Sequence, residues 1–266
     1  MNIIKNKIKS YIFFTFLISW LLWLPGILQS FSLIDLSNKL TFSLGMIGTI
    51  IPSVIGLILL INEKQLKKAL IDLFRFRLDL WIILSILILP LAIIITHIIN
   101  IFFLKGTVPI ITETYKIPFQ FIIILIIAGP LGEEIGWRGF LQSKIKEKYL
   151  SVITGLIVGL IWAIWHLPIF LIKEMPHRKL PLDQFIITLI LISIIISFFQ
   201  IRAKSGIWPA LIIHTFVNLT MEVTPLYNEK EHTLWIIANC VLFLTVIILI
   251  VLELIENIQK SHTSTN

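Results

Sequence analysis

Two adjacent glutamates and an arginine lie close together in the segment AGPLGEEIGWRGFLQ, residues 128–142. In a helix, Glu134 and Arg138 are four residues apart and share one face, where they can form a charge-assisted pair. Glu133 is turned about 100° from its neighbour because a helix has 3.6 residues per turn. The spacing therefore predicts one carboxylate held by the arginine and a second, Glu133, free to act as a base toward a substrate.

Two later segments carry further polar side chains at helical spacing. Trp162 and His166 are four residues apart in IWAIWHLPIF, and His214 and Asn218 are four apart in LIIHTFVNLT. An imidazole and an amide on one helix face can together stabilise a developing oxyanion. Alternatively, polar residues of this kind only hold helices together within a membrane bundle.

The elements that position these residues must be membrane helices. Of the 266 residues, 57% are apolar and 14% are charged, and the mean hydropathy is +0.97. A water-soluble domain typically has about 25% charged residues, so the composition excludes a soluble globular protein. We predict an all-α, polytopic integral membrane helical bundle of about eight transmembrane helices. Apolar runs place these helices near residues 11–28, 42–61, 80–104, 118–134, 150–172, 185–201, 207–221 and 233–255.

The whole chain, 1–266, is predicted to form a single membrane-embedded domain. The seventh run, 207–221, is short and contains Pro209, so we expect it to be broken, strongly buried or only partly spanning. The single cysteine, Cys240, lies in an apolar run without metal-ligand spacing and cannot form an internal disulfide.

The basic residues predict the orientation of the chain. With eight spans, fifteen of the 22 Lys and Arg residues lie in the tails and loops on one side, and such residues are retained in the cytoplasm. Both termini are therefore expected to be cytoplasmic, in a multi-pass protein of the cell membrane. Residues 64–77 alternate basic and apolar positions, as an amphipathic helix on the membrane surface would. Topology and attraction to membrane lipids account for the net charge of +7, so no nucleic-acid partner is expected.

The three polar segments, taken in order, resemble the CPBP family of intramembrane proteases, which includes CAAX prenyl proteases, bacteriocin-processing proteins and Abi proteins. The similar motifs are Glu-Glu-x-x-x-Arg, then aromatic-x-x-x-His, then His-x-x-x-Asn. The resemblance covers residues 120–222, which would form the catalytic core. One departure is Trp162, at a position where the family usually has Phe.

The resemblance implies a role for each of these residues. Glu133 would be the water-activating base and His166 its partner at the attacking water. His214 and Asn218 would bind the oxyanion. Glu134 and Arg138 would be a supporting pair.

Metal use is open at this point. Glu133, His166 and His214 could serve as a one-carboxylate, two-histidine set for zinc or another divalent metal. However, the sequence has no His-Glu-x-x-His pairing, and the resemblance is equally compatible with water activated by glutamate and histidine alone. We favour a protein without a metal cofactor.

The predicted function is an intramembrane endopeptidase that cleaves a peptide bond near the cytoplasmic membrane surface. The inferred substrate is a peptide or protein, either lipidated or of the bacteriocin type, that enters a funnel-shaped cavity open to the cytoplasm. Two alternatives remain: a membrane transporter that uses the polar residues as a proton relay, and a non-catalytic bacteriocin self-immunity protein.

Overall fold

The computed structural model describes residues 2–62, 64, 66–104, 106, 114–127, 129–223 and 232–264. All elements assigned within these ranges are helical. In chain order they are α1 Asn2–Ser30, α2 Asn38–Asn62, α3 Leu66–Phe74, α4 Leu80–Leu104, η1 Thr114–Lys116, α5 Ile117–Ile127, α6 Pro130–Glu134, η2 Ile135–Gln142, α7 Ser143–Ile145, α8 Ser151–His166, η3 Leu167–Leu171, η4 Pro176–Lys179, α9 Leu182–Arg202, α10 Trp208–Val223 and α11 Thr233–Ser264.

Seven helical segments of the described chain are long and apolar enough to cross a membrane. They correspond to seven of the eight predicted runs, and the remaining run, 207–221, forms the shorter helix α10 of 16 residues. The protein is therefore a multi-pass, all-α membrane protein, as the composition predicts.

Helix α10 is short but unbroken. Pro209 is its second residue, where the missing N–H removes no intrahelical hydrogen bond. Ala210, Leu211 and Ile213 are almost completely buried. The run 207–221 was expected to be broken, strongly buried or only partly spanning. It is strongly buried, and Pro209 does not break it.

The fourth predicted run is not one regular helix, which corrects the expectation for residues 118–134. Helix α5 ends at Ile127, and Gly129 has a φ of 104°, a conformation that favours glycine. Pro130 then begins the short helix α6, and the chain continues as the π-helix η2. Irregular turns of this kind are frequent at functional sites, and here they lie on both sides of the Glu133–Glu134 pair.

Two glycines allow α8 to approach α9 closely. A Cβ atom at Gly155 would lie 2.5 Å from Cα of Ile194, and one at Gly159 would lie 2.8 Å from Cβ of Ser193. Neither position can accept a side chain without moving the neighbouring helix. Small residues one turn apart in a membrane helix permit such a close contact between helices.

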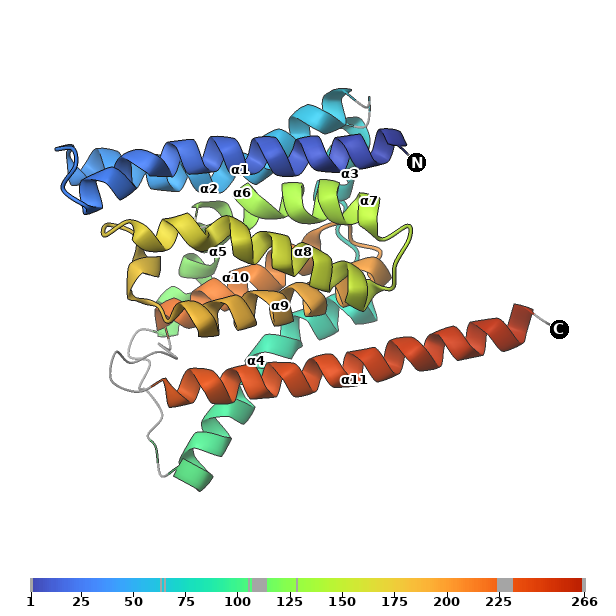
Figure 1. The fold of residues 1–266 in the computed structure, drawn as a ribbon. Coiled ribbons are helices and arrows are strands. Elements are labelled where there is room, and N and C mark those ends of the chain that lie inside the picture. Colours follow the sequence, from blue (N-terminus) through green and yellow to red (C-terminus); the bar gives the residue numbers. More distant parts are fainter. Residues whose placement is uncertain are drawn as a thin grey trace.

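Most of the long helices run roughly along one direction, with α1 and α2 along one edge of the bundle and α11 along the other, where α4 crosses obliquely (Figure 1). Helices α8, α9 and α10 lie between these edges together with α6. Both chain termini lie at the same end of the bundle, as an even number of passes requires. We call this the termini end; the connection 171–181 lies at the opposite end.

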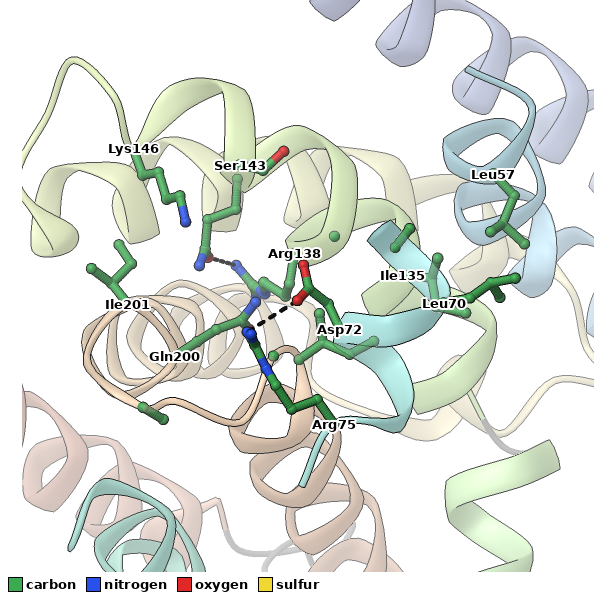
Figure 2. Close-up of a pocket in the computed structure, with 16 residues that line it drawn as sticks. Leu57, Leu70, Asp72, Arg75, Ile135, Arg138, Ser143, Lys146, Gln200 and Ile201 are labelled. Atoms are coloured by element: carbon green, nitrogen blue, oxygen red, sulfur yellow. Dashed lines mark hydrogen bonds and ion pairs between the residues drawn. The ribbon is translucent and has the colours of Figure 1, made fainter. Parts of the chain in front are cut away.

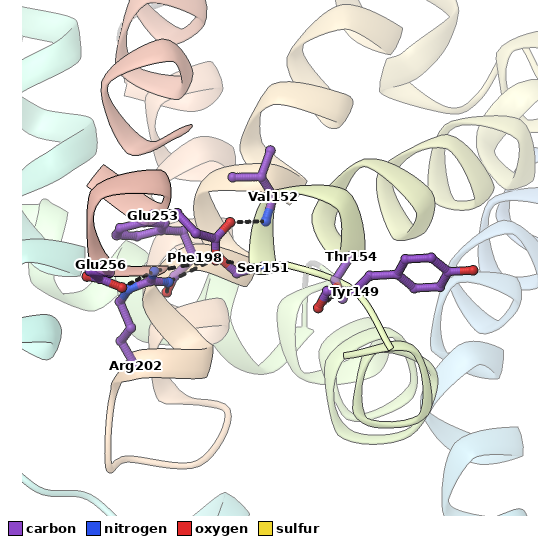
Figure 3. Close-up of polar contacts among 8 residues, drawn as sticks. All are labelled: Tyr149, Ser151, Val152, Thr154, Phe198, Arg202, Glu253 and Glu256. Atoms are coloured by element: carbon purple, nitrogen blue, oxygen red, sulfur yellow. Dashed lines mark hydrogen bonds and ion pairs between the residues drawn. The ribbon is translucent and has the colours of Figure 1, made fainter. Parts of the chain in front are cut away.

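A cluster of polar residues joins α8, α9 and α11 at the termini end (Figure 3). The carboxylate of Glu253 accepts hydrogen bonds from the backbone N–H groups of Ser151 and Val152, at 2.9 and 3.1 Å, and from the hydroxyl of Ser151. Arg202 lies 3.4 Å from Glu253 and 2.7 Å from Glu256. The carboxylate therefore caps the N-terminus of α8, where backbone N–H groups lack intrahelical partners.

Candidate active site

Glu133 lies in α6 directly after the turn at Gly129, and its side chain is buried. Its Oε2 atom accepts a hydrogen bond of 2.6 Å from Nε1 of Trp162 in α8. The Gly129 turn lies against the same carboxylate, because a Cβ atom there would be 2.9 Å from Oε1. The carboxylate is thus held by an indole and a tight turn.

Glu134 connects two partners. Oε2 accepts a hydrogen bond of 2.9 Å from Nε of Arg138, and both side chains are fully buried. This is the pair that the four-residue spacing predicts. Oε1 lies 2.8 Å from Nδ1 of His214 in α10, a contact that sequence reasoning did not anticipate. A single carboxylate therefore fixes both the arginine and a histidine from a distant helix.

His166 is oriented by the backbone of its own helix. Its Nδ1 atom lies 2.9 Å from the carbonyl oxygen of Trp162. Because a carbonyl can only accept, Nδ1 donates in this contact, and Nε2 of the neutral ring is left as a hydrogen-bond acceptor. The ring of Trp162 lies between the two histidines, with centroids 5.7 Å from His166 and 5.0 Å from His214.

One cavity of about 420 Å³ brings these residues together. Glu133, His166, His214 and Asn218, from α6, α8 and α10, all line it. The rest of its wall is mainly apolar and includes Met46, Ile124, Leu180, Phe185, Leu189, Val217 and Met221. The site therefore combines a few polar groups with an apolar enclosure, which is typical of a binding pocket.

His177 also lines this cavity, from the short helix η4. Its ring centroid lies 5.8 Å from His166, 5.7 Å from Phe170 and 5.5 Å from Phe185. Burial lowers the pKa of His177 to about 4, so this side chain is neutral near pH 7. Sequence reasoning missed it because it lies in a polar connection rather than in an apolar run.

The residues considered as zinc ligands do not form a ligand set as they are arranged here. Among the side chains that the structure describes, no three His, Cys, Asp or Glu residues are close enough to hold a metal ion. Glu133, His166 and His214 border one cavity but do not form such a group in this arrangement. No step of the proposed reaction is therefore assigned to a metal.

The cavity lies away from the chain termini. Met175, Pro176, His177 and Leu180 belong to the connection opposite the termini end, and all four line the cavity. Cytoplasmic termini and a cavity open to the cytoplasm were both expected, and with this arrangement the two expectations are incompatible. The reason is that His166 and Asn218 occur late in α8 and α10, helices that both run away from the termini end.

Comparison with known proteins shows what the residues around the site resemble. Residues 115–220 match the family described as Type II CAAX prenyl endopeptidase Rce1-like. The chain is also similar to "CAAX prenyl protease 2" of Methanococcus maripaludis, with 25% identity over 255 residues, which is 90% of this chain and 92% of the relative. Both matches are consistent with the resemblance of the chain to the CPBP family. The chain is an intramembrane protease, and the matched residues contain all six polar residues of the three motifs.

This intramembrane protease holds Arg138 through residues that motif reasoning missed. Nη1 of Arg138 donates to Ser193 in α9 at 3.0 Å, and Ser193 donates to the carbonyl oxygen of Gly155 at 2.7 Å. Ser197, one turn later, donates to Oε1 of Gln142 at 2.6 Å. Two serines four residues apart within the apolar run 185–201 were the available sequence signal.

Proposed function

We propose that this intramembrane protease hydrolyses a peptide bond with a water molecule activated by Glu133 and His166. The observation that carries the proposal is that Glu133, His166, His214 and Asn218 reach one cavity from separate helices. In the first step, Glu133 accepts a proton from the water while Nε2 of His166 orients it. The hydroxide attacks the peptide carbonyl, and the proton passes to the leaving amine.

The proposed oxyanion site is made by His214 and Asn218. Because Glu134 is paired with Arg138, it acts as a carboxylate and accepts a hydrogen bond from Nδ1–H of His214. For His214 to donate from Nε2 as well, the ring must be an imidazolium, which the Glu134 carboxylate at Nδ1 stabilises. In this proposal Glu134 is a positioning residue, and Arg138 fixes Glu134 in turn.

The proposed substrate is a peptide whose cleavage site is next to a lipidated or strongly apolar segment, including bacteriocin-type peptides. The largely apolar wall of the cavity supports this, because it can accommodate such a segment out of water. The CAAX prenyl protease from Methanococcus maripaludis supports the same substrate class by similarity. Residues 120–222 are proposed as the catalytic core of a single membrane domain, 1–266.

The direct test is cleavage of a farnesylated peptide ending in a CAAX sequence by the purified protein. Glu133→Gln preserves the size of the side chain but cannot accept the proton, so it should lower kcat by about 10²- to 10⁴-fold. The matched control is Glu147→Gln, at an exposed position outside the cavity, which should retain full activity. Wild-type turnover by Glu133→Gln would refute the assignment of the base.

We further propose that no metal takes part. Wild-type protein that has been extensively chelated, and verified as metal-free by mass spectrometry, should retain most of its activity in the same assay. Loss of activity on chelation with full recovery on adding stoichiometric zinc would overturn this proposal and leave the peptidase assignment intact. Glu133, His166 and His214 would then have to move together to bind the ion.

The orientation is also a proposal. The excess of basic residues at the termini end supports cytoplasmic termini, and the cavity then lies in the outer half of the membrane. Reporter fusions after Lys260 should be cytoplasmic, and a fusion after Arg178 should be external. The opposite pattern would reverse the protein in the membrane and place the cavity toward the cytoplasm.

A further inference from the structure

A second pocket, separate from the catalytic cavity, opens at the termini end of the bundle (Figure 2). It has a volume of about 180 Å³ and is formed mainly by α3, η2, the end of α9 and the connection between α9 and α10. Its wall includes the polar residues Asp72, Arg75, Arg138, Ser143, Lys146 and Gln200. Of its polar residues, Arg138 alone has a part in the proposed hydrolysis, through its pair with Glu134.

The pocket has an excess of positive charge. Three cationic side chains line it, from Arg75, Arg138 and Lys146, and Asp72 is the one acidic residue among them. Asp72 already pairs with Arg75 at 3.0 Å, and Arg138 pairs with Glu134, which lies outside the wall, so the excess charge is that of Lys146. Lys146 is exposed at the rim, and its charge is not balanced by an acidic residue in the described wall.

Arg138 brings to this pocket a buried hydrogen-bond donor that lacks an acceptor. Its Nε donates to Glu134 and its Nη1 to Ser193, but its buried Nη2 has no acceptor among the residues that the structure describes. A guanidinium N–H that is removed from water without a partner is unfavourable. An acceptor bound in the pocket would satisfy it.

The chemistry of the wall selects a particular class of ligand. Arginine and lysine together are the usual partners of phosphate oxygens, which carry charge and several acceptor positions. Oε1 of Gln200 is also without a partner in the described chain, and it can accept a hydrogen bond from a hydroxyl next to the phosphate.

The surroundings favour a membrane source for that phosphate. Helix α3, which forms one wall, has exposed Lys67 and Lys68 and two exposed apolar residues, Leu70 and Ile71. This is the pattern of a helix that lies at a membrane surface. We propose that the pocket binds the phosphate group of an anionic phospholipid headgroup, such as phosphatidylglycerol, whose glycerol hydroxyls face Gln200. Free phosphate shares this chemistry, and the experiment below separates the two.

The test measures lipid retention by native mass spectrometry of the detergent-solubilised protein. Wild-type protein should retain dioleoylphosphatidylglycerol in preference to dioleoylphosphatidylcholine. Lys146→Gln should weaken this retention about fivefold, the effect expected for one cationic side chain near an anionic lipid. The matched control Lys148→Gln removes the same charge two residues away, at an exposed position outside the pocket, and should change retention less than twofold.

Competition with inorganic phosphate identifies the source. If millimolar phosphate does not displace the phosphatidylglycerol, the lipid headgroup is the ligand. If phosphate displaces it from the wild type but not from Lys146→Gln, the pocket binds phosphate from solution as well. Equal weakening in the two lysine variants, or equal retention of the two lipids, would overturn the proposal.

Discussion

Among the residues that the structure describes, two arginine–glutamate clusters have similar composition and different surroundings. In one, Glu134 pairs with Arg138 in the middle of the bundle. In the other, Glu253 pairs with Arg202 at the termini end (Figure 3). The difference lies in the remaining partners of each carboxylate. Glu253 accepts its other hydrogen bonds from the start of α8, whereas Glu134 reaches His214, which lines the cavity.

The comparison teaches that a buried ion pair is not by itself a sign of catalysis. The carboxylate of Glu253 contacts the first residues of α8 and Arg202, none of which lines the cavity. It therefore stabilises helix packing. The carboxylate of Glu134 instead fixes the position of His214, whose side chain lines the cavity. Matched substitutions in the two clusters should therefore separate effects on stability from effects on turnover.

The largest expected difference is in stability. Arg138→Met leaves Glu134 charged and fully buried, and should lower the free energy of unfolding by about 3–5 kcal/mol. Arg202→Met should cost less, because Glu253 keeps its backbone N–H partners and Glu256 is about one-third exposed. Thermal unfolding in detergent measures both.

A double variant sharpens this comparison. Glu134→Leu combined with Arg138→Met removes both charges, so its unfolding temperature should be higher than that of Arg138→Met alone. A double variant that is less stable than the single one would show that the loss comes from packing rather than from the unpaired charge.

The second expected effect is on turnover. Glu134→Gln removes the charge that supports an imidazolium at His214, and should lower kcat by about 10²- to 10³-fold. Glu253→Gln makes the same change in the other cluster and should leave kcat within about twofold, although it weakens the cap of α8. Equal losses of kcat in both variants would mean that Glu134 acts only through the stability of the fold.

The smallest expected effects come from removing one hydrogen bond to a carboxylate. Trp162→Phe keeps an aromatic ring but removes the N–H that donates to Glu133, and should lower kcat about tenfold with little change in KM. Ser151→Ala removes a hydroxyl that donates to Glu253, and should lower the free energy of unfolding by about 1 kcal/mol with kcat unchanged. Full activity in Trp162→Phe would restrict Trp162 to a packing role.

Several features could be predicted from the sequence because they depend on local spacing. The apolar runs predict the membrane helices, and the four-residue spacing predicts the pair formed by Glu134 and Arg138. The interval between Gly155 and Gly159 likewise predicts a close helix contact. Each of these follows from helix geometry within one segment.

Other features depend on contacts between distant segments. The contact between Glu134 and His214 joins residues 80 positions apart, and no pattern within α6 or α10 specifies which carboxylate the histidine meets. The irregular backbone at Gly129 and in η2 was missed because the run was treated as one helix. The position of the cavity relative to the termini could not be predicted without knowing the direction in which each helix runs.

That position has a practical consequence for studying the protein. Both ends of the chain lie at the end of the bundle opposite the connection 171–181, whose residues help to form the cavity wall. An affinity tag at either end, attached to a bead or a sensor surface, would hold the molecule with its cavity-bearing end facing the solution. Peptides could then be presented to immobilised protein without obstruction by the support.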